Sequence, residues 1–154
     1  YANDITEEAI RRDFYYAFAD NKYPGVPELN IVNIEGSPFL IGDIPVQPIQ
    51  VMHHKLPVFG FRFGDFTYIT DANRIDEVEK EKIKGSKILV LNALRKESHV
   101  SHFTLDEAIS MAKELSVPEV YLTHISHQLG KHENINRELP PHIRLAYDGL
   151  TLCL

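Results

Sequence analysis

Apolar and polar positions recur along the chain with two different periods, and the first period is helical. From Thr6 to Ala19 apolar residues return at helical spacing, and Glu7 and Glu8 occupy the first turn, where the helix dipole favours acids. A loop with two prolines and a glycine follows over residues 22–28. The pattern predicts a helix over residues 6–19 with Thr6 as its N-cap.

The middle of the chain changes to the period of extended strands. Strands are predicted over residues 30–34 and 46–52, with turns marked by glycine and proline between them. Residues 57–63 and 66–70 then flank Gly64-Asp65, a two-residue turn of the Gly-X type. This segment predicts a β-hairpin.

The last part of the chain alternates between the two periods. Residues 87–94 are almost continuously apolar, as expected of a strand that is buried on both faces. Residues 105–115 are amphipathic, with Thr104 as N-cap and Glu107 at the capping-box position. Three further elements are predicted: a short helix over 76–84, a strand over 119–123, and a closing hairpin over 144–154 around Asp148-Gly149. The order predicts an α/β or α+β fold in which helices flank a mixed sheet.

Composition narrows the classes of protein that fit this pattern. The chain has 154 residues, one domain's worth, and a net charge of −6 with both signs mixed along the sequence. The acidic balance makes RNA a less favoured partner, and no apolar run approaches the length that crosses a bilayer, so no membrane partner is expected. The single cysteine, Cys153, excludes an internal disulfide and makes a cytoplasmic setting the default expectation.

Histidines gather at the ends of the predicted strands. His53 and His54 end one strand, and Asp71 ends another 18 residues later, since 71 − 53 = 18. The intervening hairpin can return the chain beside its start, so His53 and Asp71 can share one centre. The alternatives without a metal are that Asp71 is a turn residue or a helix cap and that His53 is an ordinary half-buried histidine.

Two further histidines have positions that suit chemistry. His124 ends the strand over 119–123, and imidazole is a good ligand for zinc, manganese and iron. His102 lies just before a helix N-cap, where it suits contact with an anion. His127 and His132 are expected to be supporting or loop residues, and His99 is expected to be a solvated loop residue.

Several segments together resemble the C-terminal half of the metallo-β-lactamase superfamily. They are VMHHKLPVFGFRFGDFTYITDAN, NALRKESHVSHFTLDEAI, VYLTHISHQLGKH and the closing AYDG, and they cover Ile49 to Gly149. The branch they resemble is that of the phosphoribosyl cyclic phosphodiesterase-like proteins, which are related to the tRNA 3′-end processing nucleases. The resemblance implies half of an αββα sandwich.

The resemblance also implies a role for four residues. His53 matches a ligand of one metal, and His124 matches a ligand of a second metal. Asp71 matches the acid that bridges both metals, and His102 matches a histidine that contacts the scissile phosphate or protonates the leaving oxygen. The implied cofactors are two divalent metals, zinc or manganese.

One motif of that family is absent from this sequence. The signature H-x-H-x-D-H, which supplies four more ligands, does not occur, and the chain begins with Tyr1. We therefore expect residues 1–154 to be the C-terminal portion of a single metallo-β-lactamase-like domain. With one histidine and the shared Asp71 for each metal, the chain alone is expected to be inactive.

Three functions follow from this sequence. The first is a portion of a metal-dependent phosphodiesterase that acts on a small phosphodiester, with Lys55 and Arg95 holding phosphate oxygens. The second is thioester or lactone hydrolysis on the same scaffold. The third is a non-catalytic binding domain that self-associates, because a half-sandwich exposes a sheet face; a homo-oligomer through that face is expected.

Overall fold

The chain is represented by a computed structural model that describes residues 1–153, and it divides into two units. The first unit is Tyr1–Ser37, and the second begins at Pro38. The first unit holds α1 (Asp4–Asp13) and the 3₁₀ turn η1 (Tyr15–Ala17). The helix begins two residues earlier than predicted because Asn3, and not Thr6, is its N-cap; the Asn3 side chain accepts a hydrogen bond from the Thr6 amide at 2.9 Å.

The strand predicted over residues 30–34 is wrong. Within the described part of the first unit, this segment forms only an isolated bridge between Ala2 and Asn33. The Ala2 amide donates to the Val32 carbonyl, and the Ile34 amide donates to the Ala2 carbonyl. A single bridge satisfies these groups without a ladder, so the alternation of apolar residues here does not indicate a strand.

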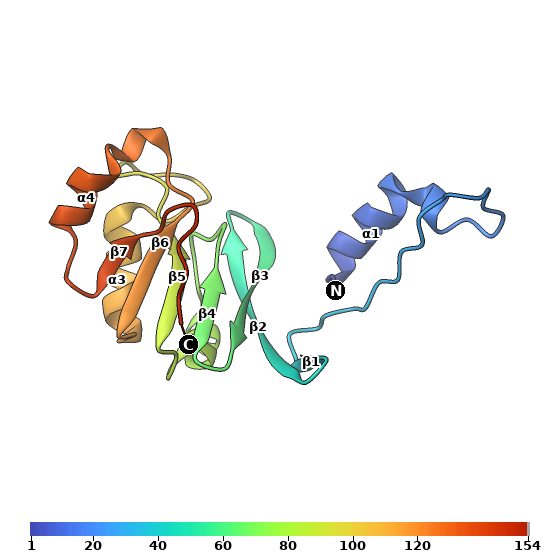
Figure 1. The fold of residues 1–154 in the computed structure, drawn as a ribbon, viewed down its shortest axis with the longest axis horizontal. Helices are drawn as coiled ribbons and strands as arrows, with labels where there is room; N and C mark the ends of the chain where they lie inside the picture. The colour runs from blue at the N-terminus through green and yellow to red at the C-terminus, as the bar shows by residue number, and fades with distance from the viewer. Residues whose placement is uncertain (154) are drawn as a thin grey trace. The chain divides into compact units, whose positions relative to one another are not determined.

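The second unit is built on one sheet whose strand order follows the sequence (Figure 1). Among the described residues its strands are β1 (Phe39–Ile41), β2 (Ile44–His53), β3 (Leu56–Phe63), β4 (Phe66–Ile69), β5 (Ile88–Asn92), β6 (Glu119–Thr123) and β7 (Ile143–Leu145). Strands β1 to β4 pair antiparallel, and β4 to β7 pair parallel. The predicted mixed sheet is confirmed.

Short helices connect the parallel strands. They are α2 (Glu77–Ile83), α3 (Leu105–Leu115), the 3₁₀ turn η2 (His127–Leu129) and α4 (His132–Glu138). The predicted capping box of α3 is present: the Thr104 hydroxyl accepts from the Glu107 amide, and the Glu107 carboxylate accepts from the Thr104 amide. All five residues of β5 are buried, as the continuous apolar run predicted.

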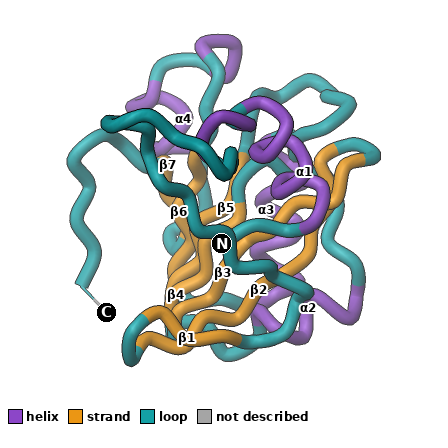
Figure 2. Tube along the Cα trace, turned by 90° about the vertical axis from the view of Figure 1, so that its right-hand side faces the viewer, coloured by secondary structure: helices purple, strands orange, loops and turns teal. Residues whose placement is uncertain are grey.

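The main core lies between one face of the sheet and the helices. Leu89 and Leu91 of β5 belong to the same buried cluster as Ala108, Ala112 and Leu115 of α3. Figure 2 shows α2 and α3 on one side of the sheet and the C-terminal segment on the other. Burial on both sides explains why the sequence of β5 shows no alternation.

The predicted closing hairpin is wrong. β7 follows the crossover through α4 and therefore runs parallel to β6, with Val120 paired to Ile143. A tight turn does form, because the Leu150 amide donates to the Tyr147 carbonyl at 3.1 Å. Within residues 146–153, however, no further strand follows; Leu150 and Leu152 pack their side chains on Ile88, Val90 and Tyr121. Burial of these side chains replaces backbone pairing.

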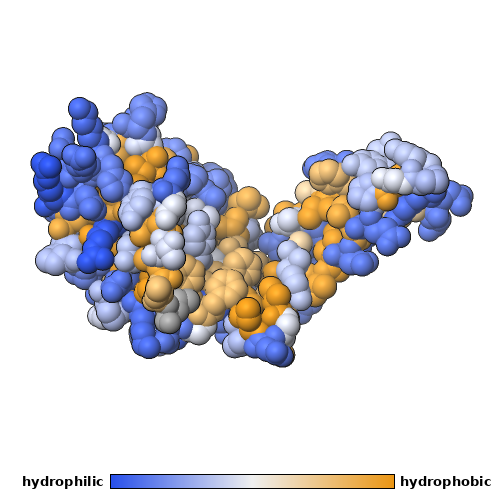
Figure 3. Space-filling view, viewed as in Figure 1, coloured by the Kyte–Doolittle hydropathy of each residue, from blue (hydrophilic) through white to orange (hydrophobic). Residues whose placement is uncertain are grey.

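An aromatic row lies on the face of the sheet that α2 and α3 do not cover. The rings of Phe59, Phe61 and Phe63 follow one another along β3, with centroids 6.3 and 6.4 Å apart. Tyr68, which pairs with Phe61 across the strands, is 40% exposed. Figure 3 shows apolar side chains gathered over this part of the sheet.

Among the described residues, none of the helices is long and apolar enough to cross a membrane.

Candidate metal centre

One edge of the sheet collects the predicted site residues. β2 ends at His53, Asp71 follows β4 by two residues, and His124 directly follows β6. These three strands run in the same direction, so their carboxyl ends meet at the same edge of the sheet. The Met52 amide donates to the Arg74 carbonyl at 2.9 Å, so the hairpin returns beside its start as predicted.

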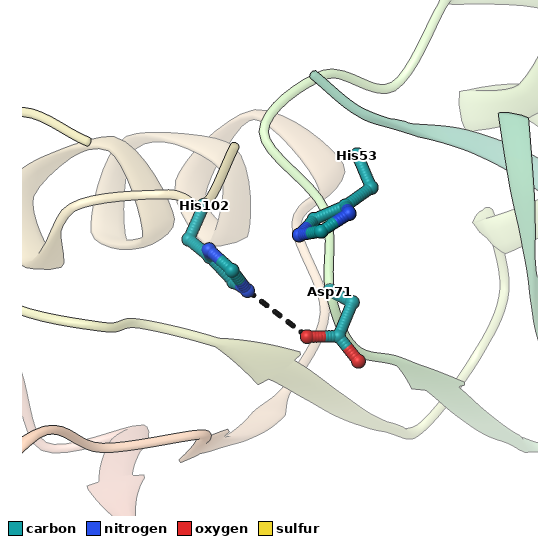
Figure 4. Close-up of side chains that lie close together, drawn as sticks. All are labelled: His53, Asp71 and His102. Carbon is teal, nitrogen blue, oxygen red and sulfur yellow. Dashed lines mark hydrogen bonds and ion pairs between the residues drawn. The ribbon is translucent and has the colours of Figure 1, made fainter. Parts of the chain in front are cut away.

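Three imidazole rings surround the Asp71 carboxylate. Asp71 Oδ1 lies 2.9 Å from His102 Nε2 and 3.4 Å from His124 Nε2. The rings of His102 and His124 stack with centroids 4.6 Å apart, and the His53 ring stands edge-on to His102 at 4.7 Å. Figure 4 shows His53 and His102 pointing toward Asp71. The structure therefore brings together all four residues that the resemblance assigned to the centre.

The backbone is strained at this edge. Asp71, His124 and His54 have φ angles of 53°, 58° and 58°, in the left-handed region that disfavours residues other than glycine. Among the described residues only one other non-glycine residue, Ser116 at the end of α3, has a positive φ. Strain that clusters in this way is typical of functional sites, where it directs a side chain out of the line of its strand.

A buried asparagine holds the Asp71 turn in place. Asn92, at the end of β5, is fully buried, and its carboxamide oxygen accepts from the Ala72 amide at 2.9 Å. Its Nδ2 donates to the Ala72 carbonyl, also at 2.9 Å. Sequence reasoning missed this residue, although an asparagine inside a continuously apolar run signals a buried amide that needs partners.

A second asparagine ties two loops of the centre together. The Asn73 carboxamide oxygen accepts from the His54 amide at 2.9 Å, and its Nδ2 donates to the Val100 carbonyl at 3.2 Å. The first contact holds the β2–β3 turn, and the second holds the loop that carries His102. No pattern in the sequence distinguished Asn73 from an ordinary turn residue.

His99 is not the solvated loop residue that the sequence predicted. It is half-buried, and its Nδ1 lies 3.1 Å from Nδ1 of His102. Ser101 Oγ lies 3.0 Å from the same His102 nitrogen. Burial lowers the pKa of His99, and the neighbouring His102 and Arg95 lower that pKa further. His99 is therefore favoured in its neutral form.

The two predicted phosphate-binding cations lie in different surroundings. Lys55 is exposed in the β2–β3 turn beside His54. Arg95 donates to the Gln128 carboxamide oxygen at 2.7 Å and to the carbonyls of Ser98 and Glu97 at 3.0 and 3.3 Å. Arg95 thus braces the loop before α3, and phosphate contact by either cation stays a prediction.

The donor set of the centre fits a divalent metal. His53, Asp71 and His102 each offer a ligand atom, and these atoms lie within 4.8 Å of one another. Among the described residues, His53 Nε2 is the buried side-chain nitrogen or oxygen that has no hydrogen-bond partner. A buried unpaired nitrogen is costly, and coordination would satisfy it. Imidazole and carboxylate together suit zinc and manganese.

The sequence matches a known family and a longer curated protein. The family model described as the Beta-lactamase superfamily domain matches residues 1–125. A protein of Porphyromonas gingivalis named octanoyltransferase is 36% identical over 152 residues, which are 97% of this chain and 31% of that protein. The chain thus spans about a third of the length of this relative.

Solved structures share the fold. A diphosphatase from the PhnP family is 36% identical, with a TM-score of 0.89 over 100% of this chain and 57% of its own. Human tRNase Z, short form, matches at 16% identity and a TM-score of 0.61, over 97% of this chain and 65% of its own. Zinc-bound PqqB from Methylobacterium extorquens matches at 15% and 0.71, over 100% and 64%. The chain therefore belongs to the beta-lactamase superfamily, as the resemblance predicted.

Proposed function

We propose that this chain is the C-terminal portion of a metal-dependent phosphodiesterase. In this proposal His53 is a terminal ligand of one metal, His124 is a terminal ligand of a second, and Asp71 bridges the two. The observation that carries it is the convergence of imidazoles on the Asp71 carboxylate, together with the unpartnered buried nitrogen of His53. Two bound divalent ions would supply an activated water and a Lewis acid at the phosphate.

His102 is the general acid that protonates the leaving group in this proposal. His102 is buried, with 8% of the residue exposed, and its Nε2 lies close to the Asp71 carboxylate, as does Nε2 of His124. A proton held at Nε2 is therefore placed to reach an oxygen that departs from a phosphorus atom at this edge. A positioned general acid contributes roughly 10²- to 10⁴-fold to the rate.

The proposed substrate is a small phosphodiester. The similar diphosphatase is named for cleavage at phosphate, which supports phosphate chemistry at this edge. Lys55 is exposed in the turn that directly follows His53, and there it can contact a phosphate oxygen. The net charge of −6 gives little support to a long RNA.

Activity is proposed for a longer protein that contains this chain. A catalytic zinc typically has three protein ligands. In this chain each of the two metals would have one histidine and a share of the Asp71 carboxylate, which is fewer. The further ligands would come from the portion that the chain does not span, since it covers 57% of the similar diphosphatase. We expect the isolated chain to show no steady turnover of bis(p-nitrophenyl) phosphate with zinc or manganese.

The longer protein tests the proposal directly. Its turnover of bis(p-nitrophenyl) phosphate should depend on manganese or zinc, and Asp71→Ala should abolish both turnover and bound metal. His53→Ala should lower the metal content, whereas His102→Ala should lower kcat and leave the metal content unchanged. If His102→Ala lost metal as His53→Ala does, His102 would be a ligand and its assignment as general acid would be overturned.

Thioester or lactone hydrolysis is the second candidate, and it is supported by a relative whose name, octanoyltransferase, refers to an acyl group. The match covers 31% of that protein, so the name belongs to a much longer chain. Both substrates should be offered to the longer protein under the same conditions. Turnover of an octanoyl thioester without turnover of the phosphodiester would favour the acyl candidate.

Self-association of the isolated chain stays a prediction. The face with Phe59, Phe61 and Phe63 is apolar and only partly covered, and such faces tend to associate. A second copy is the expected occupant when this chain is purified alone. Sedimentation should show a dimer that Phe61→Ser weakens; a clean monomer at high concentration would contradict the expectation.

A further inference from the structure

A pocket of about 260 Å³ lies beside the centre, at the carboxyl ends of the parallel strands β6 and β7. Its lining residues are Thr123, His124, Ile125, Ala146, Tyr147 and Asp148. The Ala146 amide donates to the Leu122 carbonyl at 2.8 Å, which holds the two lining segments together. His124 belongs to the pocket and also to the centre, where its Nε2 lies 3.4 Å from Asp71 Oδ1. A phosphodiester at the centre can therefore place its second ester group in this pocket.

The Asp148 side chain is not used by the turn that carries it. The turn closes through the Leu150 amide, which donates to the Tyr147 carbonyl at 3.1 Å, and Gly149 supplies the positive φ of 88°. Asp148 is exposed, and among the described residues its carboxylate forms no hydrogen bond or ion pair. Its negative charge can therefore act on a ligand in the pocket.

The lining of the pocket favours a positive group and disfavours a negative one. None of its six lining residues is lysine or arginine, so the Asp148 carboxylate has no opposite charge in the lining. A carboxylate attracts an ammonium group and repels a second phosphate or carboxylate. Tyr147 is 61% exposed, and the face of a tyrosine ring also attracts cations. The His132 ring contacts Tyr147 edge-on, with centroids 6.3 Å apart, and so restricts the tyrosine ring.

We propose that this pocket binds the ammonium group of a small phosphodiester whose second ester group is an amino or quaternary ammonium alcohol. Asp148 supplies the charge, and Tyr147 supplies an aromatic face of the kind that recognises quaternary ammonium ligands. Pockets for drug-sized ligands measure roughly 300–1,000 Å³, so this smaller pocket suits a small group. Cleavage of the ester rests on the proposed function, whereas binding of the ammonium group rests on the pocket alone.

Three phosphodiesters with the same p-nitrophenol leaving group test the charge preference in the longer protein. Their second groups are choline, its uncharged isostere neohexyl alcohol, and glycolate, which is anionic. The choline ester should have a KM about 3- to 10-fold below that of the neohexyl ester, the change that a cation–π contact and an exposed ion pair together produce. The glycolate ester should have the highest KM. Equal KM values for the choline and neohexyl esters overturn the proposal.

Two aspartate variants separate charge recognition from a structural role. Asp148→Asn removes the charge and nearly keeps the shape, so the KM ratio of the neohexyl to the choline ester should fall to about twofold, the share of Tyr147 alone. Asp43→Asn is the matched control, because Asp43 is exposed and precedes β2 at the opposite end of that strand from His53. It should leave the ratio unchanged. An effect of Asp148→Asn that is the same for all three esters would show a structural role only and overturn the proposal.

Competition separates a soluble ester from a lipid headgroup. Glycerophosphocholine in solution should inhibit cleavage of the choline ester, and phosphatidylcholine vesicles at the same headgroup concentration should not. Inhibition by the vesicles alone would overturn the assignment to a small soluble ester.

An NMR titration of the 154-residue chain tests the pocket without any turnover. Choline chloride should give saturable shifts in the amides of residues 123–125 and 146–148, and neohexyl alcohol should not. Asp148→Asn should raise the apparent Kd for choline at least about twofold, and Asp43→Asn should not change it. Absence of saturable shifts in the unsubstituted chain overturns the proposal. Failure of the longer protein to cleave any of the three esters would overturn the proposed function, and the titration would still decide the binding of the ammonium group.

Discussion

Replacing Asn92 by alanine should cost the fold more stability than most polar substitutions do. The side chain is fully buried, and it binds both the amide and the carbonyl of Ala72, which is itself fully buried. Alanine would leave the Ala72 amide without its acceptor, at a cost of about 1–3 kcal/mol. The Ala72 carbonyl would keep one donor, the Phe103 amide at 2.8 Å, so the second loss is smaller. We expect a total of about 2–4 kcal/mol once the small void is included.

Urea unfolding measures this loss. With a denaturant slope of about 2 kcal/mol/M, the middle of the usual range for urea, the midpoint should fall by about 1–2 M at an unchanged slope. Asn134→Ala is the matched control because Asn134 is exposed on α4, and it should change stability by less than about 0.5 kcal/mol. A loss below about 1 kcal/mol in Asn92→Ala would refute the assignment of a buried clamp.

Asn92→Asp separates the two hydrogen bonds of the clamp. Aspartate can still accept from the Ala72 amide, but it places an oxygen against the Ala72 carbonyl. Burial and this contact raise the pKa of the new carboxyl above its unfolded value. The deficit is therefore largest above the folded-state pKa and disappears as the pH falls below the unfolded one, where the protonated acid can donate. The urea midpoint of Asn92→Asp should lie below that of the unsubstituted chain at neutral pH, and the two midpoints should converge at acidic pH.

Three further substitutions probe other parts of the fold. His54 has a left-handed backbone, which costs a residue with a side chain about 1–2 kcal/mol, and glycine at this position would remove that cost. Glycine would lose about 0.5–1 kcal/mol to chain entropy, so the net effect of His54→Gly should be a higher thermal midpoint. A lower midpoint would contradict this. Gly60→Ala should cost about 1–3 kcal/mol in urea unfolding, because its Cβ would lie 2.9 Å from a β4 carbonyl oxygen. Hydrogen bonds from Lys80 to Glu114 and Glu77 raise the pKa of Lys80 in the folded chain. The stability that Lys80 contributes is therefore complete below its pKa in the unfolded chain and is lost as the pH rises through its pKa in the folded chain. Lys80→Met should make the free energy of unfolding fall less steeply at alkaline pH.

Local sequence patterns predicted most elements of the second unit because their causes are local. The turn at Gly64 needs a positive φ that glycine adopts freely, and the Thr104 capping box is made by residues three apart. The closing hairpin failed for the opposite reason. A turn around Gly149 was correctly indicated, but whether the chain pairs afterwards depends on β5 and β6, which are distant in sequence.

The candidate ligands were visible in the sequence because each is a polar residue at the end of an apolar strand. His53, Asp71 and His124 follow this rule, and the direction of three strands brings them to one edge. Their supports were not visible in the same way. His99 contacts His102 within one loop, and Asn73 contacts Val100 in a different loop; in a sequence both are indistinguishable from ordinary loop residues.

The strain and the supports at this edge are two sides of one arrangement. The turns at Asp71, His124 and His54 each hold a left-handed backbone at a cost of about 1–2 kcal/mol, and that cost must be offset by contacts made only in the folded state. The hydrogen bonds of Asn92 to Ala72 and of Asn73 to the His54 amide are placed next to two of these turns. Removing the hydrogen bonds of either asparagine should therefore release the adjacent turn before the sheet unfolds. In Asn73→Ala the metal affinity of the longer protein should fall although the urea midpoint hardly changes. A variant that lost stability and metal affinity strictly in proportion would contradict this local coupling.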